Sequence, residues 1–204
     1  EIIRSGIISK IEPILIGPGL GDKKTTIKLI SELLRYLKNK NNNCILDASG
    51  YEPLYNDFKL EDLPKNCILT PHLGEFKKIF NIGVEEVLDY KLFLNIQKLI
   101  NDRIIILKLF NTFIITNDMI YIMDRGPSVL ATAGTGDVLS GILVSLLSQG
   151  YKRLEASILG TYLHAESANY YIDNISKDGM TASDLIDCIP HAFNRLRKLK
   201  ESNG

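Results

Sequence analysis

Short apolar runs alternate with amphipathic segments along this chain, and this alternation restricts its fold more than any other feature. Apolar runs of strand length cover residues 11–16, 44–46, 67–69 and 104–107, and longer segments separate them. Strands that alternate with helices at this spacing predict βαβ units and a mainly parallel sheet. We therefore expect one α/β domain over residues 1–204.

The segments between and after these strands carry helical periodicity. We expect a helix capped by Asp22, a short helix that begins near Gly74, and a hairpin of residues 113–116 and 119–123. The helix that follows Asp137 is expected to end at about Gln149, before Gly150. Three further helices are expected over residues 84–100, 152–172 and 181–199, and Pro190 should kink or restart the last of them. The expected apolar positions are Ile27, Ile30, Leu34 and Leu37 in the first helix and Leu88, Leu92, Ile96 and Leu99 in residues 84–100.

Composition argues against several classes of partner. Lys and Arg number 24, equal to Asp and Glu, so the net charge of zero gives no field for nucleic acid or an anionic membrane. No apolar run approaches the roughly 18 residues of a membrane span. The three cysteines lack metal-ligand spacing, and Cys44 and Cys67, which each open an apolar run, are typical of reduced core residues. We expect an intracellular protein, in the cytoplasm, without nucleic acid or membrane partners.

Gly134-Thr135-Gly136-Asp137 is the stretch most suggestive of chemistry. Glycines allow a sharp turn and close approach of a ligand, and an apolar helical pattern begins at Val138. The N–H groups of a helix's first turn attract anions through the helix dipole. The sequence thus predicts a phosphate site, with Asp137 placed to take a proton from a substrate hydroxyl.

Other polar and glycine motifs follow the remaining predicted strands. Gly17–Gly21 follow the first, Asp47 the second, His72 and Glu75 the third, and Lys108 the fourth. Ligands bind at the carboxyl ends of strands in open α/β sheets, so these motifs predict one site.

Each motif has a structural alternative. Gly17–Gly21 suits either chain reversal or a ligand, and Asp47 either a strand-end cap or a ligand contact. His72 is interpreted as a hydrogen-bonding group rather than a metal ligand. A cation that ends a buried strand needs a partner, and for Lys108 a nucleotide phosphate would serve. The histidines and acid of the later helices are interpreted as structural: His164, Glu166 and His191.

Ala133-Gly134-Thr135-Gly136-Asp137 resembles the anion-hole signature of ribokinase-like small-molecule kinases. Further motifs narrow the resemblance to the NAD(P)H-hydrate dehydratases of the YjeF C-terminal type. These motifs are the turn at residues 17–21, Thr70-Pro71-His72-Leu73-Gly74-Glu75-Phe76, Leu139-Ser140-Gly141 and Met180-Thr181-Ala182-Ser183-Asp184-Leu185. The resemblance covers residues 13–198.

This resemblance implies a three-layer α/β/α ribokinase-like domain. It also implies dehydration of hydrated NADH or NADPH (NADHX or NADPHX), coupled to hydrolysis of ATP or ADP with Mg²⁺, as metabolite repair. Asp137 would be the catalytic base. The implied substrate contacts are Gly19, His72, Leu73, Gly74, Glu75, Phe76, Lys77, Lys78 and Asp137. The implied nucleotide contacts are Lys108, Leu109, Phe110, Asn111, Thr112, Ala133, Gly134, Thr135 and Gly136, with the approach at residues 127–136.

The chain departs from the family pattern in three places. Leu109 and Ala133 stand where the family usually has glycines, and Leu109 would crowd the nucleotide. The family's opening strand and glycine-rich turn have no counterpart before Gly17, so we expect the amino-terminal strand to be missing from the fold.

Two other functions remain open at this point. One is a ribokinase-like kinase of hydroxymethylpyrimidine, hydroxyethylthiazole or pyridoxal, and the other is a non-catalytic nucleotide-binding protein.

If the amino-terminal strand is missing, the sheet has an unpaired edge strand, which would favour a homo-oligomer.

Overall fold

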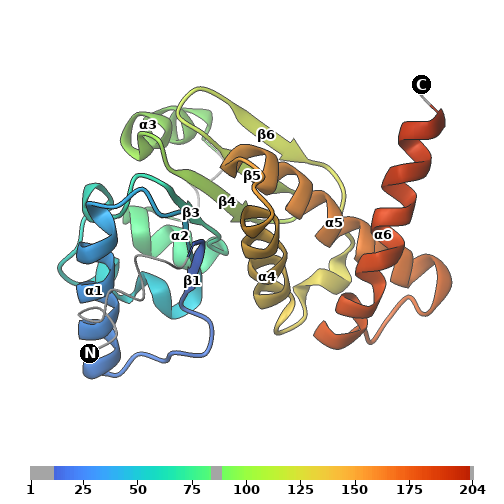
Figure 1. Ribbon diagram of the computed structural model, residues 1–204, viewed down its shortest axis with the longest axis horizontal. Helices are drawn as coiled ribbons and strands as arrows, with labels where there is room; N and C mark the ends of the chain where they lie inside the picture. Colours follow the sequence, from blue (N-terminus) through green and yellow to red (C-terminus); the bar gives the residue numbers. More distant parts are fainter. Residues whose placement is uncertain (1–11, 84–88, 203–204) are drawn as a thin grey trace.

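A six-stranded sheet, in the order β1-β2-β3-β4-β5-β6, forms the centre of the computed structural model (Figure 1). The structure describes residues 12–83 and 89–202. Strands β1 to β4 run parallel, and β5 and β6 continue the sheet as an antiparallel hairpin. The strands are β1 Ile14–Ile16, β2 Cys44–Leu46, β3 Cys67–Leu69, β4 Ile104–Lys108, β5 Thr112–Ile115 and β6 Ile120–Met123. The predicted mainly parallel sheet is confirmed.

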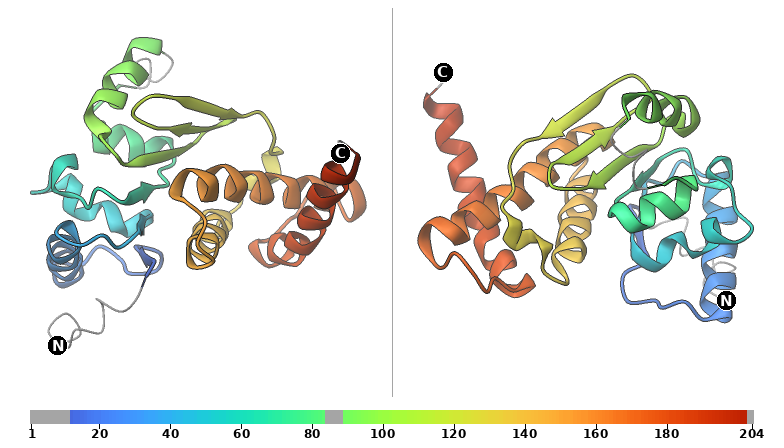
Figure 2. Two further views of the ribbon diagram at one scale, coloured as in Figure 1. Left: turned by 45° about the horizontal axis from the view of Figure 1, so that its top comes forward. Right: turned by 180° about the vertical axis from the view of Figure 1, so that it is seen from behind.

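Helices cover both faces of the sheet, which gives three layers (Figures 1 and 2). One face carries α1 (Lys24–Lys38), α2 (Leu73–Phe80) and α3 (Tyr90–Ile100). The other carries α4 (Thr135–Ser148), α5 (Arg153–Asn174) and α6 (Ala182–Ser202). The described residues also include the 3₁₀ segments η2 (Ala48–Tyr55), η3 (Leu60–Asp62) and η5 (Ser128–Ala131).

Alternation along the strands divides the core between these two faces. Leu46 and Leu69 point toward α1, α2 and α3, whereas Ile45 and Ile68 point toward α4, α5 and α6. A strand buried on both faces must be apolar at every position, which explains why β2 and β3 read as continuous apolar runs.

The turn after β1 is held close to the end of β2. Gly17 has φ 133°, and a Cβ atom on it would lie 1.6 Å from the carbonyl oxygen of Asp47. Only glycine fits this approach, so Gly17 packs the chain rather than facing a ligand. Gly19 in the same turn is exposed, with no neighbour within 4 Å of its Cβ position.

Several local expectations are wrong. Helix α1 begins after Lys23 without a side-chain cap, so Asp22 is not the capping residue. Leu99 is exposed, because α3 buries Phe93, Ile96 and Ile100 instead. Helix α6 continues through Pro190, so a restart there is wrong, and the alternative of a kink stays a prediction. Leu88 lies outside the described residues.

Cys44 and Cys67 are free and buried, as expected, and Cys188 is free and buried as well. Among the described residues, no helix combines the length and apolar character that crossing a membrane requires.

Candidate functional site

The amino terminus of α4 offers free hydrogen-bond donors at the carboxyl edge of the sheet. Gly134, at φ 88°, precedes the helix and allows the chain to turn into it. Within the described part of the chain, the backbone N–H groups of Gly136 and Asp137 have no acceptor. Donors left free at a helix start, together with the helix dipole, suit an anion.

Asp137 lies in the first turn of this helix, and its side chain is exposed. No hydrogen bond or ion pair engages its carboxylate within residues 12–83 and 89–202. The carboxylate is therefore available to a substrate beside any anion bound at the helix start.

Thr135 anchors the helix start to the layer behind it. Its Oγ1 donates to the carbonyls of Leu130 at 2.6 Å and Thr132 at 2.8 Å. Its own carbonyl accepts from Nε2 of buried His164 at 2.8 Å. Burial lowers the pKa of His164 from 6.5 to about 4, so the ring is neutral near pH 7 and Nε2 carries its proton. His164 is structural, as expected, but it supports the predicted phosphate site.

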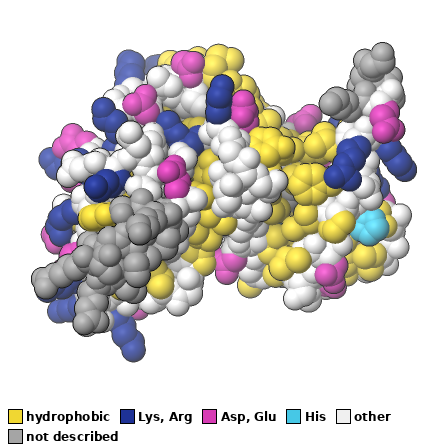
Figure 3. Space-filling view, in the orientation of Figure 1, with side chains coloured by type: hydrophobic (Ala, Val, Ile, Leu, Met, Phe, Trp, Pro, Cys, Tyr) yellow, Lys and Arg dark blue, Asp and Glu magenta, His cyan; other side chains and the backbone are white. Residues whose placement is uncertain are grey.

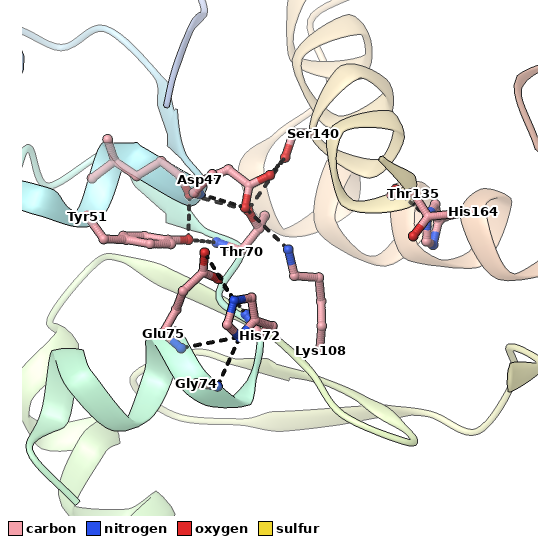
Figure 4. Close-up of polar contacts among 12 residues, drawn as sticks. Asp47, Tyr51, Thr70, His72, Gly74, Glu75, Lys108, Thr135, Ser140 and His164 are labelled. Carbon is pink, nitrogen blue, oxygen red and sulfur yellow. Dashed lines mark hydrogen bonds and ion pairs between the residues drawn. The ribbon is translucent and has the colours of Figure 1, made fainter. Parts of the chain in front are cut away.

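Lys108 places its ammonium group against this turn of α4. A Cβ atom on Gly136 would lie 3.1 Å from Lys108 Nζ, so a glycine there leaves room for the lysine. Lys108 Nζ donates to Asp47 Oδ1 at 3.2 Å (Figure 4). The partner of Lys108 in the structure is thus the Asp47 carboxylate, which follows β2, two strands away from β4, whereas the sequence predicts a nucleotide phosphate as its partner.

Asp47 is buried and fully engaged. Its Oδ1 also accepts from the N–H of Ala48 at 3.0 Å, and its Oδ2 accepts from Ser140 Oγ at 2.8 Å (Figure 4). The expected strand-end cap is confirmed, because Asp47 caps η2. The same carboxylate also joins the ends of β2 and β4 to the second turn of α4.

A buried tyrosine supports the ends of β2 and β3 beneath this cluster. Tyr51 Oη donates to the Leu46 carbonyl at 2.7 Å and accepts from the N–H of Thr70 at 2.7 Å. Burial, followed by the charge of Asp47, raises the pKa of Tyr51, so its hydroxyl stays protonated.

The amino terminus of α2 faces the same edge of the sheet. His72 caps this helix: Nδ1 accepts from the N–H of Gly74 at 2.9 Å and of Glu75 at 3.3 Å, while Glu75 accepts from the N–H of His72 at 2.8 Å (Figure 4). Since Nδ1 is an acceptor, Nε2 carries the proton. The His72 side chain is 60% exposed, and an isolated bridge pairs His72 with Lys108. The structure thus brings these two predicted site residues together.

The remaining predicted substrate contacts differ in exposure. Phe76 is fully buried and packs on Phe80 with ring centroids 4.8 Å apart, so we remove it from the candidate contacts. Lys77 and Lys78 lie in the last turn of α2, beyond its amino terminus. Leu73 is half-buried, and exposed Gly19 follows β1, two strands away from β3.

The predicted nucleotide contacts lie in two neighbouring segments. Between β4 and β5, Phe110 is 92% exposed, whereas Leu109 packs against the core. Asn111 and Thr112 are half-buried. Ala133 is exposed beside Gly134.

A groove of about 550 Å³ opens beside Asp137, between α4 and α6. Hydrophobic side chains gather on this face of the molecule (Figure 3). The residues that line the groove include Gly134, Val138, Ile142, Ile186 and Phe193.

Sequence reasoning assigned no role to Ser140 or Tyr51. Ser140 has a detectable signal, since it is a polar residue on the buried face of α4, between Leu139 and Leu143. A buried hydroxyl requires a hydrogen-bond partner, but nothing in the sequence identifies Asp47 as that partner.

Comparison with known proteins identifies the family. The profile of the NAD(P)H-hydrate dehydratase family matches residues 4–191. The chain belongs to this family. It is 30% identical over 190 residues to the ADP-dependent (S)-NAD(P)H-hydrate dehydratase of Neisseria meningitidis, with 90% of this chain and 64% of that protein covered.

Solved structures of the dehydratase family and its superfamily agree with the fold. The ADP/ATP-dependent NAD(P)H-hydrate dehydratase of Bacillus subtilis, co-crystallised with ATP/Mg²⁺ and soaked with CoA, matches with a TM-score of 0.75 and 27% identity. The match covers 90% of this chain and 66% of that one. A ribokinase-like superfamily protein of Enterococcus faecalis matches with a TM-score of 0.81 and 23% identity, over 95% of this chain and 66% of that one, and supports the fold alone. The predicted ribokinase-like fold is confirmed.

The chain is shorter than its relatives. It spans 36% of the bifunctional NAD(P)H-hydrate repair enzyme of Dictyoglomus turgidum, to which it is 30% identical over 188 residues and 91% of its own length.

Proposed function

We propose that this chain dehydrates hydrated NADH or NADPH to the reduced cofactor, coupled to hydrolysis of ATP or ADP. The observation that carries the proposal is the first turn of α4. This turn holds an unpaired carboxylate and two free amides, and the Lys108 ammonium group lies against it. Membership of the dehydratase family supports the choice of reaction, as do the printed activities of the relatives from N. meningitidis and B. subtilis.

In this proposal Asp137 takes the proton of the substrate's 6-hydroxyl as that oxygen accepts a phosphoryl group. A general base must lie within hydrogen-bond reach of the proton that it removes, and an exposed, unpaired carboxylate meets this requirement. The N–H groups of Gly136 and Asp137 and the Lys108 ammonium stabilise the negative charge on the transferred group. The bond between C6 and the phosphate oxygen then breaks, C5 loses a proton to water, and the new C5=C6 double bond restores the dihydronicotinamide ring.

Binding of the two ligands is divided between the two helix starts. His72, whose side chain is exposed and whose Nε2 lies 3.5 Å from Glu75 Oε1, contacts the hydrated dinucleotide in this proposal. The neighbouring residues Leu73, Gly74 and Glu75 contact it too, together with Gly19. Residues 108–112 and 133–136 hold the phosphates and the base of ATP or ADP.

The residues present fit a magnesium ion that arrives with the nucleotide. Among the described residues, no group of three or more His, Cys, Asp and Glu side chains could hold a metal ion. Mg²⁺ commonly binds through one or two carboxylates plus substrate phosphates, and the free carboxylate beside the anion site is Asp137. When bound, Mg²⁺ neutralises phosphate charge.

The direct test is to supply NADHX with Mg²⁺ and either ATP or ADP and to follow the absorbance of the restored dihydronicotinamide ring. NADPHX and the three vitamin precursors would be assayed in parallel. Recovery of NADH supports the proposal, whereas a phosphorylated vitamin without recovery of NADH would assign the chain to the kinases.

The role of Asp137 has its own test. Asp137→Asn should abolish turnover while ADP binding measured without Mg²⁺ changes by less than about threefold, because the amide cannot accept the proton but keeps the size of the side chain. Asp187→Asn, at an exposed aspartate of α6, is the matched control and should leave both quantities unchanged. A near wild-type rate for Asp137→Asn would exclude Asp137 as the base.

A further inference from the structure

The ion pair between Asp47 and Lys108 is unusual in its burial. The side chain of Asp47 is 3% exposed and that of Lys108 is 23% exposed, with 3.2 Å between Oδ1 and Nζ. Charges are costly to bury, and a buried pair often contributes no more to stability than apolar residues of the same volume. Stability alone therefore does not explain this pair, and its location suggests another reason.

Hydrogen bonds fix the Asp47 carboxylate from both sides. Ser140 Oγ donates to Oδ2 at 2.8 Å and the N–H of Ala48 donates to Oδ1 at 3.0 Å. Since Ser140 belongs to α4, the helix that presents the free amides also holds the carboxylate. The carboxylate therefore has a fixed position relative to the amides.

Lys108 reaches this carboxylate from the end of β4 and passes over Gly136. Its Nζ lies so close to Gly136 that a Cβ atom there would be 3.1 Å away. A lysine side chain has four rotatable bonds and would sample many positions at a sheet edge without a partner. Asp47 is the group that holds Nζ in the position beside Gly136.

We propose that Asp47 is a positioning residue, which holds the Lys108 ammonium group beside the amides of α4 so that it contacts the phosphate of a nucleotide. The proposal rests on the proposed nucleotide-binding function of this site. Ordering one long side chain in advance corresponds to about three- to tenfold in affinity. Asp47 itself does not touch the phosphate in this arrangement.

Three other roles for Asp47 make different predictions. If the Asp47 carboxylate only repelled phosphate, it would weaken nucleotide binding, and removal of its charge would tighten nucleotide binding. A direct magnesium ligand would act with or without Lys108. A purely structural residue would change the melting temperature and leave the affinity of the folded protein unchanged.

A double-mutant cycle on ADP binding separates these roles. Calorimetry with ADP and Mg²⁺ would be carried out on the wild type, Asp47→Asn, Lys108→Ala and the double variant. We expect Lys108→Ala to weaken binding by about tenfold or more, as expected for loss of a charged hydrogen bond. Asp47→Asn should weaken binding by about three- to tenfold in the wild type and by less than about twofold in the Lys108→Ala background.

Each contrary result overturns the proposal. Equal weakening by Asp47→Asn in both backgrounds indicates direct action, tighter binding indicates repulsion, and unchanged affinity indicates a structural role. If the wild type binds none of ADP, ATP and inorganic phosphate, both the proposed function and this inference are wrong. If it binds ADP but does not dehydrate NADHX, the dehydratase function is wrong while the cycle still tests Asp47.

The chain offers a matched control and a second variant. Lys38 of α1 and Asp62 of η3 form an exposed ion pair at 3.0 Å, and Lys38→Ala with Asp62→Asn should leave ADP affinity unchanged in every combination. If Asp47→Asn does not fold, Ser140→Ala keeps the charge and removes the bond that orients the carboxylate. Ser140→Ala should weaken ADP binding in the same direction, and an unchanged affinity would contradict the proposal.

Discussion

Gly136 is the position at which the backbone of α4 and the ammonium group of Lys108 approach each other. Because a Cβ atom there would lie 3.1 Å from Nζ, Gly136→Ala should displace the ammonium group from the helix start. We expect ADP binding to weaken by about tenfold, as when a charged hydrogen bond is lost. Calorimetry of ADP binding, with the melting temperature as a check on folding, measures this effect.

Gly141→Ala is the matched control for this prediction. Gly141 lies in the same helix, with no neighbour within 4 Å of its Cβ position. This substitution should leave ADP affinity unchanged and stabilise the protein by up to about 0.5–1 kcal/mol through helix propensity. Wild-type affinity in Gly136→Ala would show that the displaced ammonium group does not contact ADP.

At this scale the sequence predicts residue types better than it predicts their partners. Lys108 is recognisable because a buried strand seldom ends in a cation. Its ion pair with Asp47 joins residues 61 positions apart, and a single sequence carries no signal for that pairing. The sequence does not predict the burial of Phe76, because a motif at a helix start does not indicate which of its side chains point into the core.

The turn between β1 and α1 has two glycines with different tasks. A Cβ on Gly17 would overlap the carbonyl of Asp47 at 1.6 Å, whereas a Cβ on Gly19 meets nothing within 4 Å. Gly17→Ala should therefore destabilise the protein by more than about 3 kcal/mol, in the range of severe backbone or packing defects. Gly19→Ala, at φ 73°, should cost about 1 kcal/mol of backbone strain.

Chemical denaturation measures the free energy of unfolding of both variants. Similar losses for Gly17→Ala and Gly19→Ala would show that the turn relaxes around a side chain at residue 17. The two variants also separate packing from binding, because weaker NADHX binding in Gly19→Ala without a large loss of stability would support the predicted substrate contact.

Helix positions were easier to predict than helix orientations. The stripe expected for residues 84–100 and the stripe that α3 buries share Ile96, and both satisfy helical spacing. The structure buries Phe93 and Ile100 beside it, leaving Leu99 57% exposed. Two apolar faces compete in such a helix, and the position of the sheet decides between them.

Across the whole molecule, the alternating pattern predicted the layers but not every contact between them. The parallel order and the edge that carries the site follow from strands that alternate with helices. The groove between α4 and α6 and the bond from His164 to Thr135 depend on how the helices pack over one face, which sequence periodicity does not encode.

Burial of the His164 ring makes the stability of the whole fold sensitive to acid. Burial, together with the charge of Lys108, lowers the pKa of His164 to about 4 in the folded protein, against 6.5 for an exposed histidine, although the hydrogen bond to Thr135 raises it. The unfolded chain therefore binds a proton as the pH falls through 6.5, and the folded chain does not until about pH 4. This contribution to stability is fully present above pH 6.5 and is lost between pH 6.5 and 4.

The shift from 6.5 to about 4 corresponds to a loss of roughly 3 kcal/mol over that interval. His164→Gln keeps a donor for the Thr135 carbonyl but cannot titrate, so its stability should fall less steeply than that of the wild type as the pH is lowered. Urea denaturation at several pH values measures the difference, and exposed His191, changed to Gln, is the control that should keep the wild-type slope. Equal slopes for the wild type and His164→Gln would assign the acid sensitivity to other groups.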